Sequence, residues 1–185
     1  IAAKSSLFLT TDQVNAVKTA RLQKHSALGI LDLSDLNDEN NKMRIAIKHG
    51  SNRAYNKSRL GLVKLENGSS PNNYEINGIN ENQRGLFTDA ISDNIIYFKG
   101  KSFNKVRSNT RRKVIHWSLD KADAGLYGVV MVTSDKEALT FGDSLNPDRR
   151  QHLKAFGDNY FGFEDLLSNQ SSDWDFDDMS IKFEL

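Results

Sequence analysis

Short segments with the apolar patterning of β-strands follow one another along most of this chain, and they constrain its fold more than any other feature. Residues 43–49 alternate apolar and polar side chains, which is typical of a strand with one buried face. On that pattern Met43, Ile45 and Ile47 face a core, whereas Arg44 and Lys48 face water or a ligand. Residues 125–133 (GLYGVVMVT) are apolar almost throughout, which favours a central strand.

Other segments extend this pattern. Further strands are predicted at 27–33, 60–65, 74–79, 94–98, 113–119 and 179–185, the last as an edge strand. Helices are predicted at 10–26, capped by Thr11 or Asp12, at 81–91, and at 147–156 with Pro147 in the first turn, followed by a turn at 163–167. Because strands outnumber helices and arrive in consecutive runs, we expect an α+β fold with a largely antiparallel sheet flanked by a few short helices.

The bulk composition limits the class of protein. At 185 residues, 38% hydrophobic and 26% charged, the chain fits one globular domain spanning 1–185. It lacks an initiator Met, so we expect a domain cut from a longer chain. No apolar run reaches the ~20 residues of a membrane span and no signal peptide is visible, so we expect a cytoplasmic protein. The absence of cysteine excludes disulfides, thiol catalysis and thiolate metal sites.

Positive charge is concentrated in two windows. The first cationic window, residues 40–65, holds seven Lys or Arg and no Asp or Glu; the second cationic window, residues 94–119, holds seven more, again without an acid. The net charge of +1 conceals this, because the acids gather elsewhere. Fourteen of the 25 basic residues in two such windows indicate a surface for a polyanion.

The second cationic window carries the chemistry that nucleic acid requires. Its aromatics alternate with cations and with small polar donors, so it offers charge for phosphates and rings for unpaired bases. We therefore predict a non-catalytic nucleic-acid-binding domain, with DNA favoured over RNA and no membrane, metal or cofactor. The predicted phosphate contacts are Lys101, Lys105, Arg107, Arg111, Arg112 and Lys113, with Arg44 and Lys48 secondary. The alternative is that both windows are ordinary solvated surface.

Acidic residues dominate the C-terminal part of the chain. Residues 158–181 hold seven acids and no Lys or Arg, and SSDWDFDDM at 171–179 mixes them with Trp174 and Phe176. This stretch resembles the acidic, aromatic tails by which single-strand-binding proteins recruit partners and mimic DNA. The resemblance implies a protein partner, or docking on the basic face when nucleic acid is absent. The alternatives are a structural turn that packs the two rings on the core, or a cation site without EF-hand spacing.

Enzyme motifs were tested as the competing interpretation. The Gly-Lys-Ser at 100–102 lacks the first glycine of a phosphate-binding loop, since position 95 is Ile95. The four histidines form no zinc spacing, and no Asp-x-Lys, Glu-x-Lys or G-x-S-x-G occurs. The enzyme alternative, acting on a phosphorylated or nucleic-acid substrate, would use a scattered site with His116, His49 and Asp120 as its first candidates.

A short linear pattern points to DNA metabolism. Residues 83–87 (QRGLF) resemble the Gln-x-x-Leu-Phe peptide by which many bacterial DNA-processing proteins bind the sliding clamp. The same residues lie inside the helix predicted at 81–91, which would bury Leu86 and Phe87.

Overall fold

Two antiparallel sheets form the body of the protein. The computed structural model describes residues 9–36, 41–49, 58–67, 73–98, 112–133, 135–167 and 173–184. The seven-stranded sheet has the order β1 (Ile30–Leu33), β8 (Gly125–Val132), β3 (Arg59–Asn67), β4 (Tyr74–Ile76), β5 (Ile79–Asn80), with β6 (Ile96–Tyr97) beside β3 and β9 (Ala138–Leu139) beside β8. The five-stranded sheet has the order β10 (Leu153–Gly157), β11 (Tyr160–Phe163), β12 (Met179–Glu184), β2 (Asn41–His49), β7 (Arg112–Leu119). The predicted α+β fold with antiparallel sheet is therefore confirmed.

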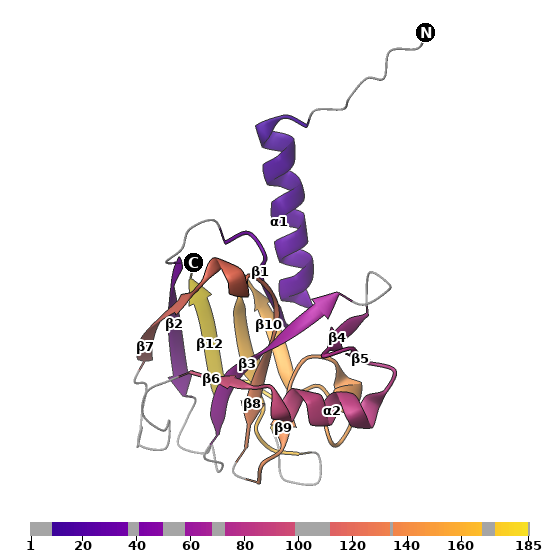
Figure 1. Ribbon diagram of the computed structural model, residues 1–185. Helices are drawn as coiled ribbons and strands as arrows, with labels where there is room; N and C mark the ends of the chain where they lie inside the picture. The colour runs from indigo at the N-terminus through magenta and orange to yellow at the C-terminus, as the bar shows by residue number, and fades with distance from the viewer. Residues whose placement is uncertain are drawn as a thin grey trace.

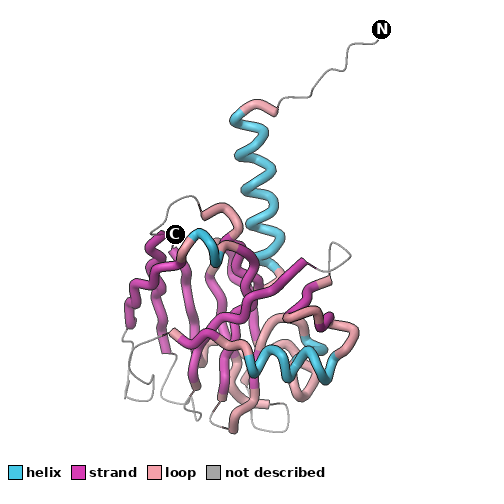
Figure 2. The backbone as a smooth tube through the Cα atoms, in the orientation of Figure 1, coloured by secondary structure: helices cyan, strands magenta, loops and turns pink. Residues whose placement is uncertain are grey.

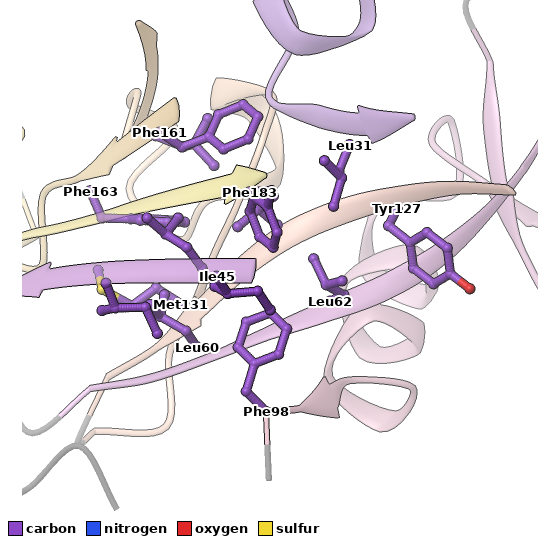
Figure 3. Close-up of a cluster of buried hydrophobic side chains, with 14 of the residues drawn as sticks. Leu31, Ile45, Leu60, Leu62, Phe98, Tyr127, Met131, Phe161, Phe163 and Phe183 are labelled. Atoms are coloured by element: carbon purple, nitrogen blue, oxygen red, sulfur yellow. The ribbon is translucent and has the colours of Figure 1, made fainter. Parts of the chain in front are cut away.

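The main core lies between the two sheets. Leu62 of β3 and Val129 of β8 come from one sheet, Ile45 of β2 and Ile181 of β12 from the other, and all four are fully buried in one cluster. Figure 3 shows part of this cluster, in which Ile45 lies between the two sheets together with Leu60 and Leu62 of β3. The alternating pattern at 43–49 is confirmed, since Met43, Ile45 and Ile47 are buried while Arg44 and Lys48 are exposed. The prediction of a central strand at 125–133 is also confirmed, because β8 pairs with β1, β3 and β9.

A second core covers the outer face of the seven-stranded sheet. Helix α2 (Arg84–Asp93) contributes Phe87 and Ile91, which pack with Val63 of β3 and Val130 of β8. The segment 138–145, which ends in the 3₁₀ turn η3 (Asp143–Leu145), adds Phe141 and Leu145 to the same cluster. Within the described residues, no helix covers the outer face of the five-stranded sheet, although the C-terminal end of α1 contacts β10 at its edge. Figure 2 shows α2 on the side of the seven-stranded sheet.

Helix α1 (Thr11–Ala27) projects from the body of the protein, as Figure 1 shows. It is capped by Thr10 rather than by the predicted Thr11 or Asp12: the backbone N–H of Gln13 donates to the Thr10 hydroxyl, and the N–H of Thr10 donates to the Gln13 side chain. This reciprocal pair satisfies two helix-end donors at once, which neither predicted cap would do. Its first ten residues are exposed, so only the C-terminal end of α1 joins the body.

A buried carboxylate fastens the C-terminal end of α1 to β1. Asp32 is 3% exposed and accepts hydrogen bonds from Arg21 Nε at 3.0 Å and from the Ser34 backbone N–H at 3.1 Å. His25 Nδ1 lies 2.7 Å from the same carboxylate. Burial raises the pKa of Asp32, but the Ser34 and His25 hydrogen bonds and the Arg21 charge outweigh it and leave the pKa below 3.8.

Two predicted segments near the C-terminus are wrong. The helix predicted at 147–156 is a turn followed by β10, and the turn predicted at 163–167 begins inside β11. In β10 Leu153 is buried and Phe156 is exposed, whereas the helix prediction placed both inward. Gly157, Asp158 and Asn159 all have positive φ and form the turn that pairs β10 with β11. Sheet pairing therefore overrides the local signal of Pro147.

Two other strand predictions need correction. The strand predicted at 74–79 is a hairpin of β4 and β5, because Asn77 and Gly78 both adopt positive φ, the conformation of a tight hairpin turn. The predicted edge strand at 179–185 is internal, because β12 pairs with β11 on one side and with β2 on the other. The strands predicted at 60–65, 94–98 and 113–119 are present as β3, β6 and β7, and the one at 27–33 begins only at Ile30, where α1 has ended.

Candidate nucleic-acid interface

The outer face of the five-stranded sheet is the candidate interface. In a strand, side chains alternate between the two faces, so the neighbours of the buried residues point outward. In β2 these are Lys42, Arg44 and Lys48, all exposed; in β7 they include Val114 and His116. We call this surface the open face, defined by the outward residues of β10, β11, β12, β2 and β7.

Pairing between β2 and β7 brings the strand portions of the two cationic windows together. Arg44 is the register partner of His116, and Lys48 is the partner of Arg112. Residues directly opposite each other in an antiparallel ladder occupy the same face. The two windows are separated in sequence by residues 66–93, yet their strands β2 and β7 are neighbours in one sheet (Figure 1). Most of the other cations of the two windows fall in the stretches 50–57 and 99–111, outside the described residues.

The predicted phosphate contacts fall into three groups. Lys101, Lys105, Arg107 and Arg111 lie outside the described residues. Arg112 and Lys113 belong to β7, where their backbone is described but not their side chains. Arg44 and Lys48 are exposed on the open face, and Arg44 forms an ion pair with Glu184 of β12. Because both partners of this pair remain partly exposed, the pair leaves the Arg44 charge open to solvent.

Sequence reasoning missed two cations on this face. Lys182 of β12 is the register partner of Ala46, and Lys154 of β10 is the partner of Gly162. Both lysines are exposed. The alternation in 179–184 could have identified Lys182 as outward, but its place inside the sheet depends on pairing with β2. Lys154 was missed because the segment 147–156 was predicted to be a helix. The described cations of the open face are therefore Lys42, Arg44, Lys48, Lys154 and Lys182.

Two exposed aromatic rings lie beside Lys154. Phe156 is 47% exposed and Tyr160 is 37% exposed, and their ring centroids are 5.1 Å apart. The Lys154 Nζ atom lies 5.6 Å from the centre of the Phe156 ring. Exposed rings next to a cation are able to stack on unpaired bases and to neutralise the adjoining phosphate.

The first cationic window is divided between the two sheets. Its last cations, Arg59 and Lys64, belong to β3 of the seven-stranded sheet. The Arg59 guanidinium carbon lies 3.7 Å from the centre of the Tyr97 ring, where it is held by a cation–π contact. These two residues therefore do not contribute to the open face, although they lie in the same window of sequence.

The acidic segment 173–178 lies against one end of the open face. A side chain on Gly162 of β11 would meet the Phe176 carbonyl oxygen at 2.3 Å and the Phe156 ring at 2.6 Å, so glycine permits this close approach. The Phe176 ring also contacts Lys154, with 5.6 Å between Nζ and the ring centre. Trp174 lies beside His152, with 5.3 Å between ring centroids. The two rings thus pack on the outer surface of β10 and β11 and are not part of the sandwich core.

Exposure alternates along the acidic segment. Trp174 and Phe176 are half-buried and both have positive φ, whereas Asp173, Asp175 and Asp177 are exposed. The backbone therefore turns the rings toward the sheet and the carboxylates toward solvent. Burial and the neighbouring Asp175 raise the pKa of Asp177, with smaller contributions from the other acids of the segment.

Carboxylates next to this segment are the described residues best able to hold a cation. Oxygens of Glu164, Asp173 and Asp175 lie within 4.8 Å of one another, and so do those of Glu164, Asp165 and Asp178. Such oxygen sets suit hard cations such as Ca²⁺. One of these acids also has a structural contact, because the Asp165 backbone N–H donates to the Asp178 carboxylate at 2.9 Å.

The structure does not bring the candidate catalytic residues together. His116 is the register partner of Arg44, five residues along β2 from His49, which corresponds to about 16 Å. Asp120 is exposed beyond the end of β7. His25, Asp32 and Ser34 do meet, but the Ser34 hydroxyl donates to Asp32 and not to His25. This arrangement lacks the contact between nucleophile and base that acyl transfer requires.

Two further motifs are explained by the fold. His152 is fully buried, with Nδ1 at 2.9 Å from the Glu164 carbonyl oxygen and Nε2 at 2.9 Å from Asp148, so it is a structural residue. In the clamp-like segment 83–87, Leu86 is 56% exposed but Phe87 is fully buried, so only one of the two anchoring side chains is accessible. The prediction that Leu86 is buried is therefore wrong.

Comparison with protein-family models, curated proteins and solved structures finds no match to this chain. None of the helices within the described residues is long and apolar enough to cross a membrane.

Proposed function

We propose that the open face binds nucleic acid without catalysing a reaction, with DNA favoured over RNA. The observation that carries this proposal is the β2–β7 pairing, which sets the strand portions of both cationic windows side by side. Five strands at about 4.8 Å spacing, and a rise of six residue steps from Lys42 to Lys48 in β2, give a surface of roughly 20 Å by 20 Å. That area accommodates several consecutive phosphates of a single strand.

The chemistry of the face favours single strands over duplex. The broad face of a five-stranded sheet does not fit into a groove, whereas it can support an extended strand. The exposed rings of Phe156 and Tyr160 supply stacking surfaces, and the flanking cations supply charge. Within the described strands of the sheet, Glu184 is the single acid that points outward, and it is paired with Arg44.

The test is an anisotropy titration with a labelled mixed-sequence single strand and the matching duplex. If five lysines and arginines each neutralise a phosphate, the logarithm of affinity falls with a slope of about −3.5 against the logarithm of salt. Affinity should then fall about 100-fold between 50 and 200 mM salt. The single strand should bind more tightly than the duplex. Failure to bind either one at the low-salt end would overturn the proposal.

A pair of matched variants locates the site. Lys48→Glu with Lys182→Glu reverses two charges on the open face and should weaken binding by at least about 30-fold. Lys64→Glu with Lys136→Glu makes the same change in net charge at exposed sites of the seven-stranded sheet and its β8–β9 turn, and should weaken binding by less than about 3-fold. Equal losses in both variants would show that only net charge matters.

A further inference from the structure

A cavity of about 610 Å³ lies on the opposite side of the protein from the open face. Its floor is apolar and is built from Ile30 of β1, Tyr74 of β4, Phe141 and Leu145, all 6% exposed or less. Its mouth is formed by the end of α1, the turn before α2, and η3. The volume falls in the range of sites that enclose small molecules.

The floor of the cavity is pre-formed. The rings of Tyr74 and Phe141 meet edge to face, with 5.8 Å between centroids, which fixes both orientations. Gly128 of β8 lies directly beneath Phe141, since a side chain there would meet the Phe141 ring at 2.7 Å. The ring therefore rests against the sheet backbone, and the floor can receive a flat apolar group without rearrangement.

Two opposite charges line the same cavity. Glu81, in the turn before α2, is half-buried, and no residue in the described ranges hydrogen-bonds or ion-pairs with its carboxylate. Burial disfavours the charged form of Glu81 and raises its pKa. Lys24, in the last turn of α1, also lines the cavity, and it forms no ion pair with Glu81. A half-buried carboxylate gains most from a ligand that brings a positive group.

We propose that this cavity binds a free aromatic α-amino acid. The aromatic side chain packs on Tyr74 and Phe141, the ammonium group pairs with Glu81, and the carboxylate pairs with Lys24. A zwitterion satisfies both charges, whereas an aromatic amine leaves Lys24 without a partner and an aromatic acid leaves Glu81 without one. This site is separate from the open face and does not depend on the proposed nucleic-acid binding.

Three probes with the same ring test the charge requirement: L-phenylalanine, 2-phenylethylamine and 3-phenylpropionate. Ligand-observed NMR and calorimetry should give a Kd of about 1 mM for L-phenylalanine, the value expected for a ligand of this size. Each singly charged analogue should bind at least about 5-fold more weakly, since one charged contact is missing. No binding of L-phenylalanine at about 10 mM, or equal binding of all three, would overturn the proposal.

Two single substitutions should give crossed effects. Glu81→Gln should weaken the binding of L-phenylalanine and 2-phenylethylamine by about 10-fold and leave the binding of 3-phenylpropionate unchanged. Lys24→Met should weaken the binding of L-phenylalanine and 3-phenylpropionate and leave the binding of 2-phenylethylamine unchanged. Glu66→Gln, on an exposed site of β3, is the matched control and should change nothing. If either cavity variant affects all three probes equally, the charged contacts are not made and the proposal fails.

Filling the cavity provides a test that does not depend on charge. Ala27 lines the mouth from the C-terminal end of α1 and is itself exposed, so Ala27→Trp can place its ring in the cavity without entering the core. Binding of L-phenylalanine should be lost while the thermal midpoint stays near that of the parent protein. Undiminished binding in this variant would show that the probe binds elsewhere and would overturn the proposal.

Discussion

The outer faces of the two sheets have different surroundings. The outer face of the seven-stranded sheet is covered by α2 and by residues 138–145, and its outward residues Val63 and Val130 are fully buried. The open face of the five-stranded sheet carries lysines and an arginine at corresponding outward positions. The inner faces of both sheets contribute buried apolar side chains to the main core. The outward residues therefore distinguish a face that holds the fold together from one that is available for a ligand.

This difference predicts that substitutions on the two outer faces will have different effects. Changes on the covered face should lower the free energy of unfolding, because buried apolar area is removed or buried charge is left without its partner. Changes on the open face should leave stability almost unchanged and alter binding, because exposed charges contribute little to folding.

The largest effect is expected at Phe87 of α2. This ring is fully buried against the seven-stranded sheet, so Phe87→Ala should lower the free energy of unfolding by about 3–5 kcal/mol. Val114→Ala is the comparison on the open face, where Val114 is 40% exposed, and it should cost less than about 0.5 kcal/mol. Urea unfolding measures both. Similar losses for the two variants would mean that something covers the open face as well.

Breaking a buried charge pair should lower the free energy of unfolding more than breaking an exposed one. Asp32 is 3% exposed and joins Arg21 and His25, so Asp32→Asn should cost about 3 kcal/mol by leaving buried donors poorly matched. Glu184→Gln breaks the ion pair with Arg44, in which both side chains are at least 40% exposed, and should cost less than about 1 kcal/mol. Thermal or urea unfolding at neutral pH compares the two.

The Asp32 contribution should also depend on pH. Because the folded-state pKa lies below the ordinary value of 3.8, the stabilisation is fully present above that value. It is lost as the pH falls further, through the folded-state pKa. The difference in unfolding free energy between the parent protein and Asp32→Asn should therefore shrink as the pH is lowered from about 5 to about 2. A difference that stays constant over this range would contradict the assignment.

An intermediate effect is expected at Gly162, where the acidic segment touches the open face. Gly162→Val would force the Phe176 carbonyl and the Phe156 ring away, and it should cost about 1–3 kcal/mol. Trp174 fluorescence, read in a Trp117→Phe background, should shift as its ring becomes more exposed. Gly85→Ala is the control, because a side chain there meets nothing within 4 Å, and in a helix it should stabilise by about 0.5–1 kcal/mol.

The two sheets also show which features the sequence alone could predict. The alternation at 43–49 correctly predicted both the buried and the exposed residues of β2, because period-two patterning is local. The helix predicted from Pro147 failed because the partner of β10 lies across a turn whose residues Asp158 and Asn159 adopt positive φ. The sequence of 147–156 contains no periodic pattern that indicates this turn.

Most of the open face depends on pairing between distant residues. Lys48 and Arg112 are 64 positions apart, and a slip of one residue in the β2–β7 ladder would put them on opposite faces. The sequence identified the cationic windows but not which of their members share a surface. Lys182 was missed for the same reason, since the position of β12 inside the sheet follows from its pairing with β2, far earlier in the chain.

The smallest effect concerns the acidic segment as a competitor for the open face. Asp173, Asp175 and Asp177 are exposed on the segment whose Phe176 ring contacts Lys154, and burial together with the neighbouring acids raises the pKa of Asp177. Changing these three residues to Asn should raise single-strand affinity by about 3–10-fold at 50 mM salt, with a smaller gain at 200 mM salt. Asp178 is kept, because it accepts the hydrogen bond from Asp165.

The control for this last prediction changes Asp89, Asp93 and Asp143 to Asn, three exposed acids on the covered side of the protein. Both variants gain three units of charge, so any difference between them reports position and not net charge. Equal gains would show that the acidic segment has no special relation to the open face. A gain confined to the 173–177 variant, with unchanged stability, would mean that the segment and the nucleic acid compete for the same cations.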